Sequence, residues 1–285
     1  MNAPTPDLLS LNSMDAAVNR WTAEAAGDLL ARHFNGRCAL LADLGFSGDL
    51  AVGLKWKVGA ERLEVLHPDA DRLAQLRRDN ASAPVDTWRS CEPLALSLLE
   101  SKVDLLIMAD VLHEIYSEAG RVGFDPGGGI HHELALAHVQ RVLQEAVGAL
   151  TPDGALLIAT DVLPSRVGTC RFEPRHRHDD SFVNSATAML RAEELGLKPG
   201  FGLEYEAPQD ALAVLLAEFD QPTPGMIRPF LSLEDWRTML HDIGLELRLI
   251  VGTPAEVQHA REANFSLEPA LWPEKRAVIL ALRRG

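Results

Sequence analysis

Residues 38–49 have the sequence CALLADLGFSGD, and this stretch decides how the rest of the chain is interpreted. A short apolar run ends in Asp43, and the turn that follows contains Gly45, Ser47 and Gly48. Such a run predicts a buried strand whose C-terminal end meets a ligand. Glycine suits this place because it has no Cβ and tolerates positive φ. In an open α/β sheet ligands bind beyond the carboxyl ends of the strands, so we expect a binding site at this turn.

Three later stretches continue the alternation of strand and helix. Residues 62–69 predict a second strand that leads into a helical pattern, and residues 103–115 predict a strongly apolar strand with a polar end. Residues 150–164 contain a helix end, a turn and another strand. Near-continuous apolar runs are typical of parallel strands covered on both faces. The chain is therefore predicted to form an α/β sheet.

Taken in order, these stretches resemble class I S-adenosylmethionine (SAM)-dependent methyltransferases from about residue 15 to the C-terminus. The resemblance implies a Rossmann-like α/β sandwich with a mostly parallel seven-stranded sheet. It also implies one domain over 1–285, with a helical lead-in over 14–36 that helps to cover the site and an inserted cap segment over 165–230. The implied cofactor is SAM.

Periodicity, caps and turn residues predict the remaining elements. Helices are expected over 14–34, 70–80, 93–101, 133–149, 182–195, 210–219 and 232–243, the last with a capping pattern of Ser232 and Asp235. Strands are expected over 63–66, 83–90, 103–109, 155–160, 245–251 and 277–282, with a loop joining the last two. Residues 51–59 predict a weak helix, and residues 116–132 predict an insertion without regular structure.

Composition narrows the class of protein. The 285 residues suffice for one large domain, and a net charge of −14 argues against a broad nucleic-acid surface. No apolar run approaches the roughly 18 residues of a membrane span, and the N-terminus lacks the pattern of a signal peptide. We therefore expect a cytoplasmic protein that acts on a small molecule, without membrane contact; a homodimer is a further possibility. Three cysteines without paired spacing favour neither a disulfide scaffold nor a zinc site.

The glycine turn departs from the pattern of the family it resembles. There an acidic residue precedes Gly-x-Gly-x-Gly, and the turn lies against the amino-acid part of SAM. Asp43 and Gly45 match this pattern, but Ser47 stands at the second glycine position. The third position holds Asp49, unless a shorter loop places Gly48 there. The resemblance thus implies that Asp43, Gly45, Ser47 and Gly48 bind the cofactor.

The resemblance implies cofactor contacts at the ends of two further strands. At the end of the second strand the family places a carboxylate that accepts hydrogen bonds from both ribose hydroxyls. His67 stands at that position, and its neutral ring could accept one such bond, while Asp69 could replace it from the loop. A site that holds no ribose here remains an alternative. After the fourth strand, Asp110 and Val111 stand where family members approach the cofactor.

Candidate catalytic residues follow directly. His113, Glu114 and Tyr116 could serve the transfer of a methyl group, which mainly requires alignment of the acceptor with the sulfonium methyl. A base is needed only if the acceptor must lose a proton, and histidine has a suitable ordinary pKa. The alternative is structural, because a Leu-His-Glu sequence at this place also helps a helix to begin.

Several functions stay open. The preferred one is methyl transfer to a small molecule, for example in specialised metabolism. The altered positions also allow a non-catalytic partner or scaffold with this fold, or a SAM-binding enzyme of different chemistry. The basic stretch 166–178 is interpreted as a solvated loop or as a contact for an acidic substrate. Segments 120–130 and 165–180 are predicted to be mobile parts of a lid.

No metal site is expected. The histidines in and beside these segments lack the spacing of a rigid site. They are His131, His132, His176 and His178, with Asp179 and Asp180 beside them.

Overall fold

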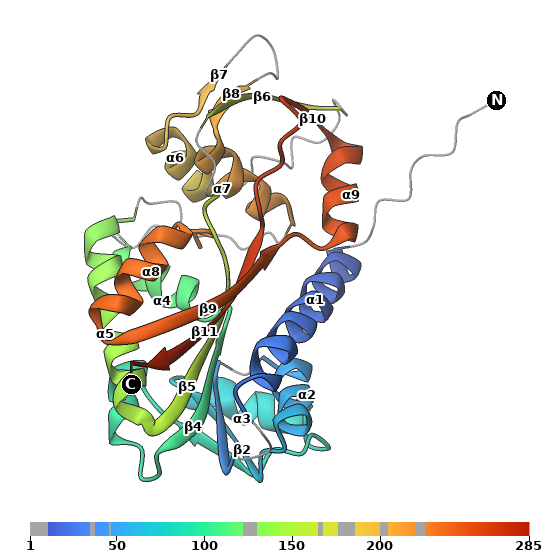
Figure 1. Cartoon of the computed structure of the whole chain (residues 1–285). Helices are drawn as coiled ribbons and strands as arrows, with labels where there is room; N and C mark the ends of the chain where they lie inside the picture. The colour runs from blue at the N-terminus through green and yellow to red at the C-terminus, as the bar shows by residue number, and fades with distance from the viewer. Residues whose placement is uncertain are drawn as a thin grey trace, which may run out of the picture.

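The computed structural model describes residues 11–34, 38–45, 47–121, 130–164, 168–175, 186–199, 205–220 and 226–284. Figure 1 shows a central sheet with helices on both faces and a smaller group of elements at one end. None of the helices in these ranges is both long and apolar enough to cross a membrane.

Seven strands form the central sheet in the order β3-β2-β1-β4-β5-β11-β9. The neighbours from β3 to β5 are parallel, and β11 runs antiparallel to both β5 and β9. A mostly parallel sheet of seven strands is what the sequence resemblance implies, so the predicted fold class is confirmed. The strands are β1 Leu40–Leu44, β2 Arg62–His67, β3 Thr87–Ser90, β4 Val103–Ala109, β5 Leu150–Asp161, β9 Leu245–Gly252 and β11 Arg276–Arg283.

Alternate side chains of the buried strands enter two separate hydrophobic cores. In β4, Leu106 and Met108 pack with α4, α5 and α8, whereas Leu105 and Ile107 pack on the opposite face with α1 and α2. The period of two along a strand produces this division, and it explains why β4 is apolar almost throughout. The helices of this part are α1 Leu11–Ala31, α2 Asp49–Val58, α3 Ala70–Asp79, the 3₁₀ helix η1 Pro93–Leu98, α4 Leu112–Gly120, α5 His132–Ala149 and α8 Leu233–Asp242.

A second, antiparallel sheet has the order β10-β6-β8-β7 and its own hydrophobic core. Figure 1 shows it with its helices at one end of the molecule, where the chain leaves the carboxyl end of β5. We call this group of elements the cap. Its elements are β6 Thr169–Pro174, α6 Ala186–Glu194, β7 Lys198–Pro199, β8 Tyr205–Pro208, α7 Gln209–Asp220, α9 Ala255–Asn264 and β10 Phe265–Glu268.

Two expectations about the elements were wrong. The residues after β4 continue as helix α4 to Gly120, because Leu112, Ile115 and Tyr116 bury one helical face. The weak helix expected over 51–59 is present as a regular helix over 49–58, which Gly59 ends in the left-handed conformation at φ 65°. The last two strands of the central sheet are joined by α9 and β10, and not by a plain loop.

The cap is therefore not confined to residues 165–230, since β10 pairs with β6 from beyond that range. The division of the chain into one domain stays a prediction. Residues 122–129, 165–167 and 176–185 lie outside the described ranges, and with them most of the two predicted lid segments and His176, His178, Asp179 and Asp180.

Candidate functional site

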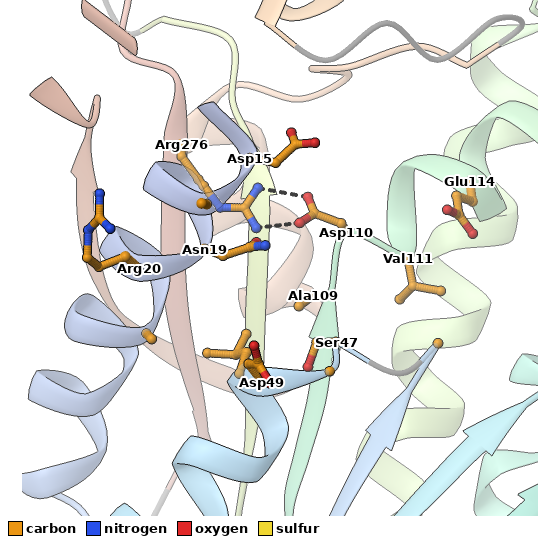
Figure 2. A pocket seen from close by; sticks show the side chains of 15 residues that line it. Asp15, Asn19, Arg20, Ser47, Asp49, Ala109, Asp110, Val111, Glu114 and Arg276 are labelled. Carbon is orange, nitrogen blue, oxygen red and sulfur yellow. Dashed lines mark hydrogen bonds and ion pairs between the residues drawn. The ribbon is translucent and has the colours of Figure 1, made fainter. Parts of the chain in front are cut away.

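Two cavities meet at the carboxyl ends of the parallel strands. Cavity 1 has a volume of about 830 Å³ and lies between α1, the turn after β1 and the residues after β4 (Figure 2). Cavity 2 has a volume of about 1080 Å³ and extends over the end of β2 toward η1, α4 and α5. Gly45, Val111 and Glu114 line both cavities. The two cavities thus form one groove across the sheet.

Asp43 holds the turn after β1 and does not line either cavity. Its side chain is fully buried, and Oδ2 accepts hydrogen bonds from the backbone N–H of Ser47 at 2.6 Å and from the Ser47 hydroxyl at 3.0 Å. The Oδ1 atom has no hydrogen-bond partner in the described part of the chain. Burial raises the pKa of Asp43 to about 7, although the bonds from Ser47 oppose this. The serine at the second glycine position therefore has a local function as the partner of Asp43.

Gly45, in the turn after β1, lies against Val111 from the residues after β4. It has φ 95°, and its N–H donates to the Leu66 carbonyl at 2.9 Å. A Cβ at this position would lie 3.3 Å from both Cβ and Cγ2 of Val111. Glycine is thus favoured by its conformation and by the space available. Ser47 and Gly48 continue the wall of cavity 1, and Asp49 begins α2 there as an exposed acidic residue.

The end of β2 is organised by contacts between His67 and Asp69, which both line cavity 2. The Asp69 N–H donates to His67 Nδ1 at 3.0 Å. His67 Nδ1 also lies 3.1 Å from the Asp69 carbonyl oxygen, so either tautomer of the neutral ring finds a partner there, and the acceptor role of His67 toward a ribose stays a prediction. Asp69 Oδ1 caps α3 by accepting from the N–H groups of Asp71 and Arg72 at 2.8 and 2.9 Å. Those bonds lower the pKa of Asp69, and the bond from Arg72 has the largest effect.

Asp110 lies in cavity 1 in an unusual conformation. With φ 58°, it is the one non-glycine residue with positive φ in the described part of the chain. Its carboxylate accepts two hydrogen bonds from Arg276, from Nη1 to Oδ1 at 2.7 Å and from Nη2 to Oδ2 at 2.5 Å (Figure 2). Burial alone would raise the pKa of Asp110, but the charge and bonds of Arg276 hold it well below its ordinary value. Val111 follows as a buried apolar wall.

The three candidate catalytic residues of α4 separate into two groups. Glu114 is an exposed residue where the cavities join, and loss of part of its hydration raises its pKa against the opposing charge of Arg228. His113 lines neither cavity; its Nε2 accepts from Arg228 Nε at 2.8 Å, and burial lowers its pKa to about 3. Tyr116 is also buried, with its hydroxyl 2.6 Å from His132 Nδ1, and burial raises its pKa to about 12.

Sequence reasoning missed the contributions of distant segments to the groove. Arg276 begins β11 and reaches Asp110 across 166 positions of sequence, while Asp15 and Asn19 of α1 line cavity 1. Glu92, ahead of η1, lines cavity 2. A usable signal was the pair Lys275 and Arg276 directly before an apolar strand, because buried cations require partners. No cluster of three or more potential metal ligands occurs within the described ranges.

Comparisons with known proteins find similar structures but no relatives by sequence. Neither a scan against protein-family models nor a search of curated proteins finds a match. Among solved structures, TnmH is 14% identical over 96% of this chain and 58% of its own, with a TM-score of 0.48. An O-methyltransferase family protein from Burkholderia thailandensis is 14% identical over 98% and 61% of the two chains, with a TM-score of 0.45. This chain thus spans about three fifths of the length of each.

The magnesium protoporphyrin IX methyltransferase from Synechocystis PCC 6803, solved with bound SAH, is similar over most of its own chain. It is 12% identical over 100% of this chain and 90% of its own, with a TM-score of 0.48. At such low identity, the fold of this chain is established by its own sheet order.

Proposed function

We propose that this protein binds SAM in the groove and transfers its methyl group to a small-molecule acceptor. The observation that carries the proposal is one groove along the carboxyl ends of β1, β2 and β4, with Gly45 lining both of its cavities, in a sheet of this order. That edge is where an open α/β sheet binds ligands. When bound, SAM would supply an electrophilic methyl group on a positively charged sulfur.

The lining of the groove fits the two ends of SAM. Cavity 1 exposes the carboxylates of Asp15, Asp49 and Asp110, which suit the positive charges of the sulfonium and ammonium groups. Cavity 2 combines the polar groups of His67 and Asp69, which suit a ribose, with the apolar side chains of Val111 and Ile115, which suit a purine ring. The order of these groups along the sheet supports an extended molecule that crosses Gly45.

Glu114 is the best-placed candidate to receive a proton from the acceptor. It stands where the two cavities join, and its raised pKa makes it a stronger base than an ordinary glutamate. In the present arrangement His113 cannot take this role, because Arg228 occupies its Nε2 lone pair. The acceptor would approach from the side of α1 and the cap, and the acidic character of the chain favours a small molecule over a nucleic acid.

Calorimetric titration with SAM and with S-adenosylhomocysteine tests the proposal. We expect micromolar affinity, roughly −8 kcal/mol, for the wild-type protein. Gly45→Ala should weaken binding about tenfold or more, because the added Cβ crowds Val111 in the groove. Gly53→Ala is the matched control: it lies in α2 with no atom within 4 Å of its added Cβ, so it should leave affinity unchanged.

Absence of heat together with absence of a thermal shift at millimolar ligand would contradict the proposal. It would favour the second candidate, a non-catalytic partner with this fold, which Ser47, Asp49 and His67 motivate. Binding without methyl transfer to any acceptor would favour a SAM-dependent enzyme of different chemistry. A cytoplasmic location and a homodimer stay predictions.

A further inference from the structure

A chain of buried charges connects cavity 1 with the cap. Three carboxylates and three cations alternate along it, so that each neighbour of a charge has the opposite sign. Its members lie in five separate segments of the sequence. In order from the cavity they are Asp110, Arg276, Asp161, Lys275, Asp220 and Arg261.

Arg276 is the member that touches the cavity residue. Its side chain is 1% exposed, and each nitrogen of its guanidinium has a partner. Nη1 and Nη2 hold the two oxygens of Asp110, Nε donates to Thr22 Oγ1 at 2.7 Å, and Nη1 also lies 3.4 Å from Asp161 Oδ1. Segments from α1, β5 and β11 therefore fix the position of this guanidinium, and the guanidinium fixes the carboxylate.

Asp110 needs such support. A left-handed conformation is unfavourable for a residue with a Cβ, and it persists where the surrounding contacts impose it. The planar fork of arginine matches both carboxylate oxygens at once, which a lysine could not do. The side chain of Asp110 is still 30% exposed, toward cavity 1, so the pairing leaves part of the carboxylate accessible to a ligand.

We propose that Arg276 is a positioning residue of the groove: it holds Asp110 in its left-handed conformation and ionised, so that the positively charged end of the cofactor meets a fixed negative charge. This inference rests on the proposed function, since it assigns a role toward SAM. Arg276 itself does not touch the cofactor. Lys275 has no such role, because its contacts are with Asp161 and Asp220, away from Asp110.

The charged groups around Asp110 show what removal of Arg276 would change. Arg276 faces it from β11, Asp161 from the end of β5, His113 from α4 and Arg228 from the segment before α8. Burial of Asp110 opposes its ionisation, and Arg276 is the largest opposing influence. Without Arg276 the carboxyl would take up a proton at a much higher pH, and its charge would then depend on pH in the neutral range.

Titration of SAM at several pH values between about 5.5 and 8 tests this, with S-adenosylhomocysteine in parallel. Three variants are compared with the wild type: Arg276→Gln, Arg276→Lys and Lys275→Met. We expect the affinity of Arg276→Gln to fall with decreasing pH more steeply than in the wild type, by up to about tenfold per pH unit. Arg276→Lys, which keeps the charge, should recover the wild-type profile in part. Lys275→Met removes a buried cation of the same chain and should keep the wild-type profile.

Urea unfolding of the ligand-free proteins over the same pH range gives a second readout. In Arg276→Gln, an Asp110 pKa raised above its unfolded value makes stability fall as pH rises, and adding Asp110→Asn to this variant should remove the part of the slope that comes from Asp110. If the wild type fails to bind SAM, the proposed function fails, while this slope still decides whether Arg276 holds Asp110 ionised.

Identical pH profiles of SAM affinity in Arg276→Gln and Lys275→Met, or an unfolding slope of Arg276→Gln that Asp110→Asn leaves unchanged, would overturn the inference. Should Arg276→Gln not fold, Asp110→Asn replaces it. This variant should bind SAM more weakly than the wild type by a similar factor at each pH, and an unchanged affinity would overturn the inference.

Discussion

At the scale of single residues, the buried side chain of Asp43 stabilises the turn after β1 through its hydrogen bonds. It is fully buried at the end of a buried strand, and one of its oxygens organises Ser47. Its other oxygen lacks a partner in the described part of the chain. Burial without full compensation is the physical reason that its pKa rises to about 7. The stability of the turn should therefore depend on pH near neutrality.

Replacement of Asp43 by Asn should remove this dependence. A carboxyl whose folded pKa is raised stabilises the fold fully below its unfolded pKa of about 3.9, and this contribution is lost as pH rises through about 7. The free energy of unfolding of the wild type, relative to Asp43→Asn, should thus decrease from about pH 5 to pH 8 in urea titrations. Parallel pH profiles of the two proteins would show that Asp43 does not titrate in this range.

At the scale of elements, residues 226–231 form a strap across α4. The Ile227 N–H donates to Ser117 Oγ at 2.9 Å, Arg228 donates to His113, and Phe230 stacks on Tyr116 with ring centroids 4.5 Å apart. These contacts occupy one face of α4. They explain why His113 and Tyr116 are turned from the groove while Glu114, on another face of the same helix, reaches it.

Loss of the buried hydrogen bond between the strap and α4 should lower the free energy of unfolding. In Ser117→Ala the buried Ile227 N–H loses its acceptor, so we expect the free energy of unfolding to fall by about 1–3 kcal/mol. Ser90→Ala is the matched control. Its hydroxyl is exposed and makes a weak 3.4 Å contact with the Pro68 carbonyl, so it should change stability by less than about 0.5 kcal/mol. Equal effects in urea unfolding would show that water replaces the lost acceptor under the strap.

At the scale of the whole molecule, ion pairs join the cap to the central sheet. Arg261 of α9 holds Asp220 of α7 at 2.7 Å, and Asp220 lies 3.2 Å from Lys275 beside β11. These side chains are at most 2% exposed, so each charge depends on its neighbours for compensation. A second bridge, between Arg20 of α1 and Glu256 of α9, is exposed to solvent.

The two kinds of bridge should differ in their contribution to stability. Arg261→Met leaves Asp220 with one cation and should cost about 3–5 kcal/mol in urea unfolding, because a buried charge loses compensation. Arg20→Met breaks a bridge of similar length, 2.6 Å, at the surface and should cost less than about 1 kcal/mol.

A double variant, Asp220→Asn with Arg261→Met, tests the reason for the larger cost. It should be more stable than Arg261→Met alone, since no uncompensated carboxylate remains. Additive losses from the two substitutions would indicate that the cap is held by packing and not by charge compensation.

The sequence by itself was sufficient for the features that depend on neighbours along the chain. The apolar run before Asp43, the glycine at position 45 and the capping pair Ser232 and Asp235 identified a strand, its turn and a helix start. Each depends on local backbone geometry or on a period of two or 3.6 residues, which a sequence displays directly. The α/β class of the fold followed from the alternation of such strands and helices along the chain.

Only the tertiary structure decided which side chains enter the groove. Asp110 and Arg276 are paired across 166 positions, and Arg228 reaches His113 across 115. β10, which follows β9 in the sequence, pairs with β6 of the cap. These pairings minimise the cost of burying charge and unpaired backbone among segments distant in sequence, and no local pattern records which distant segment supplies the partner.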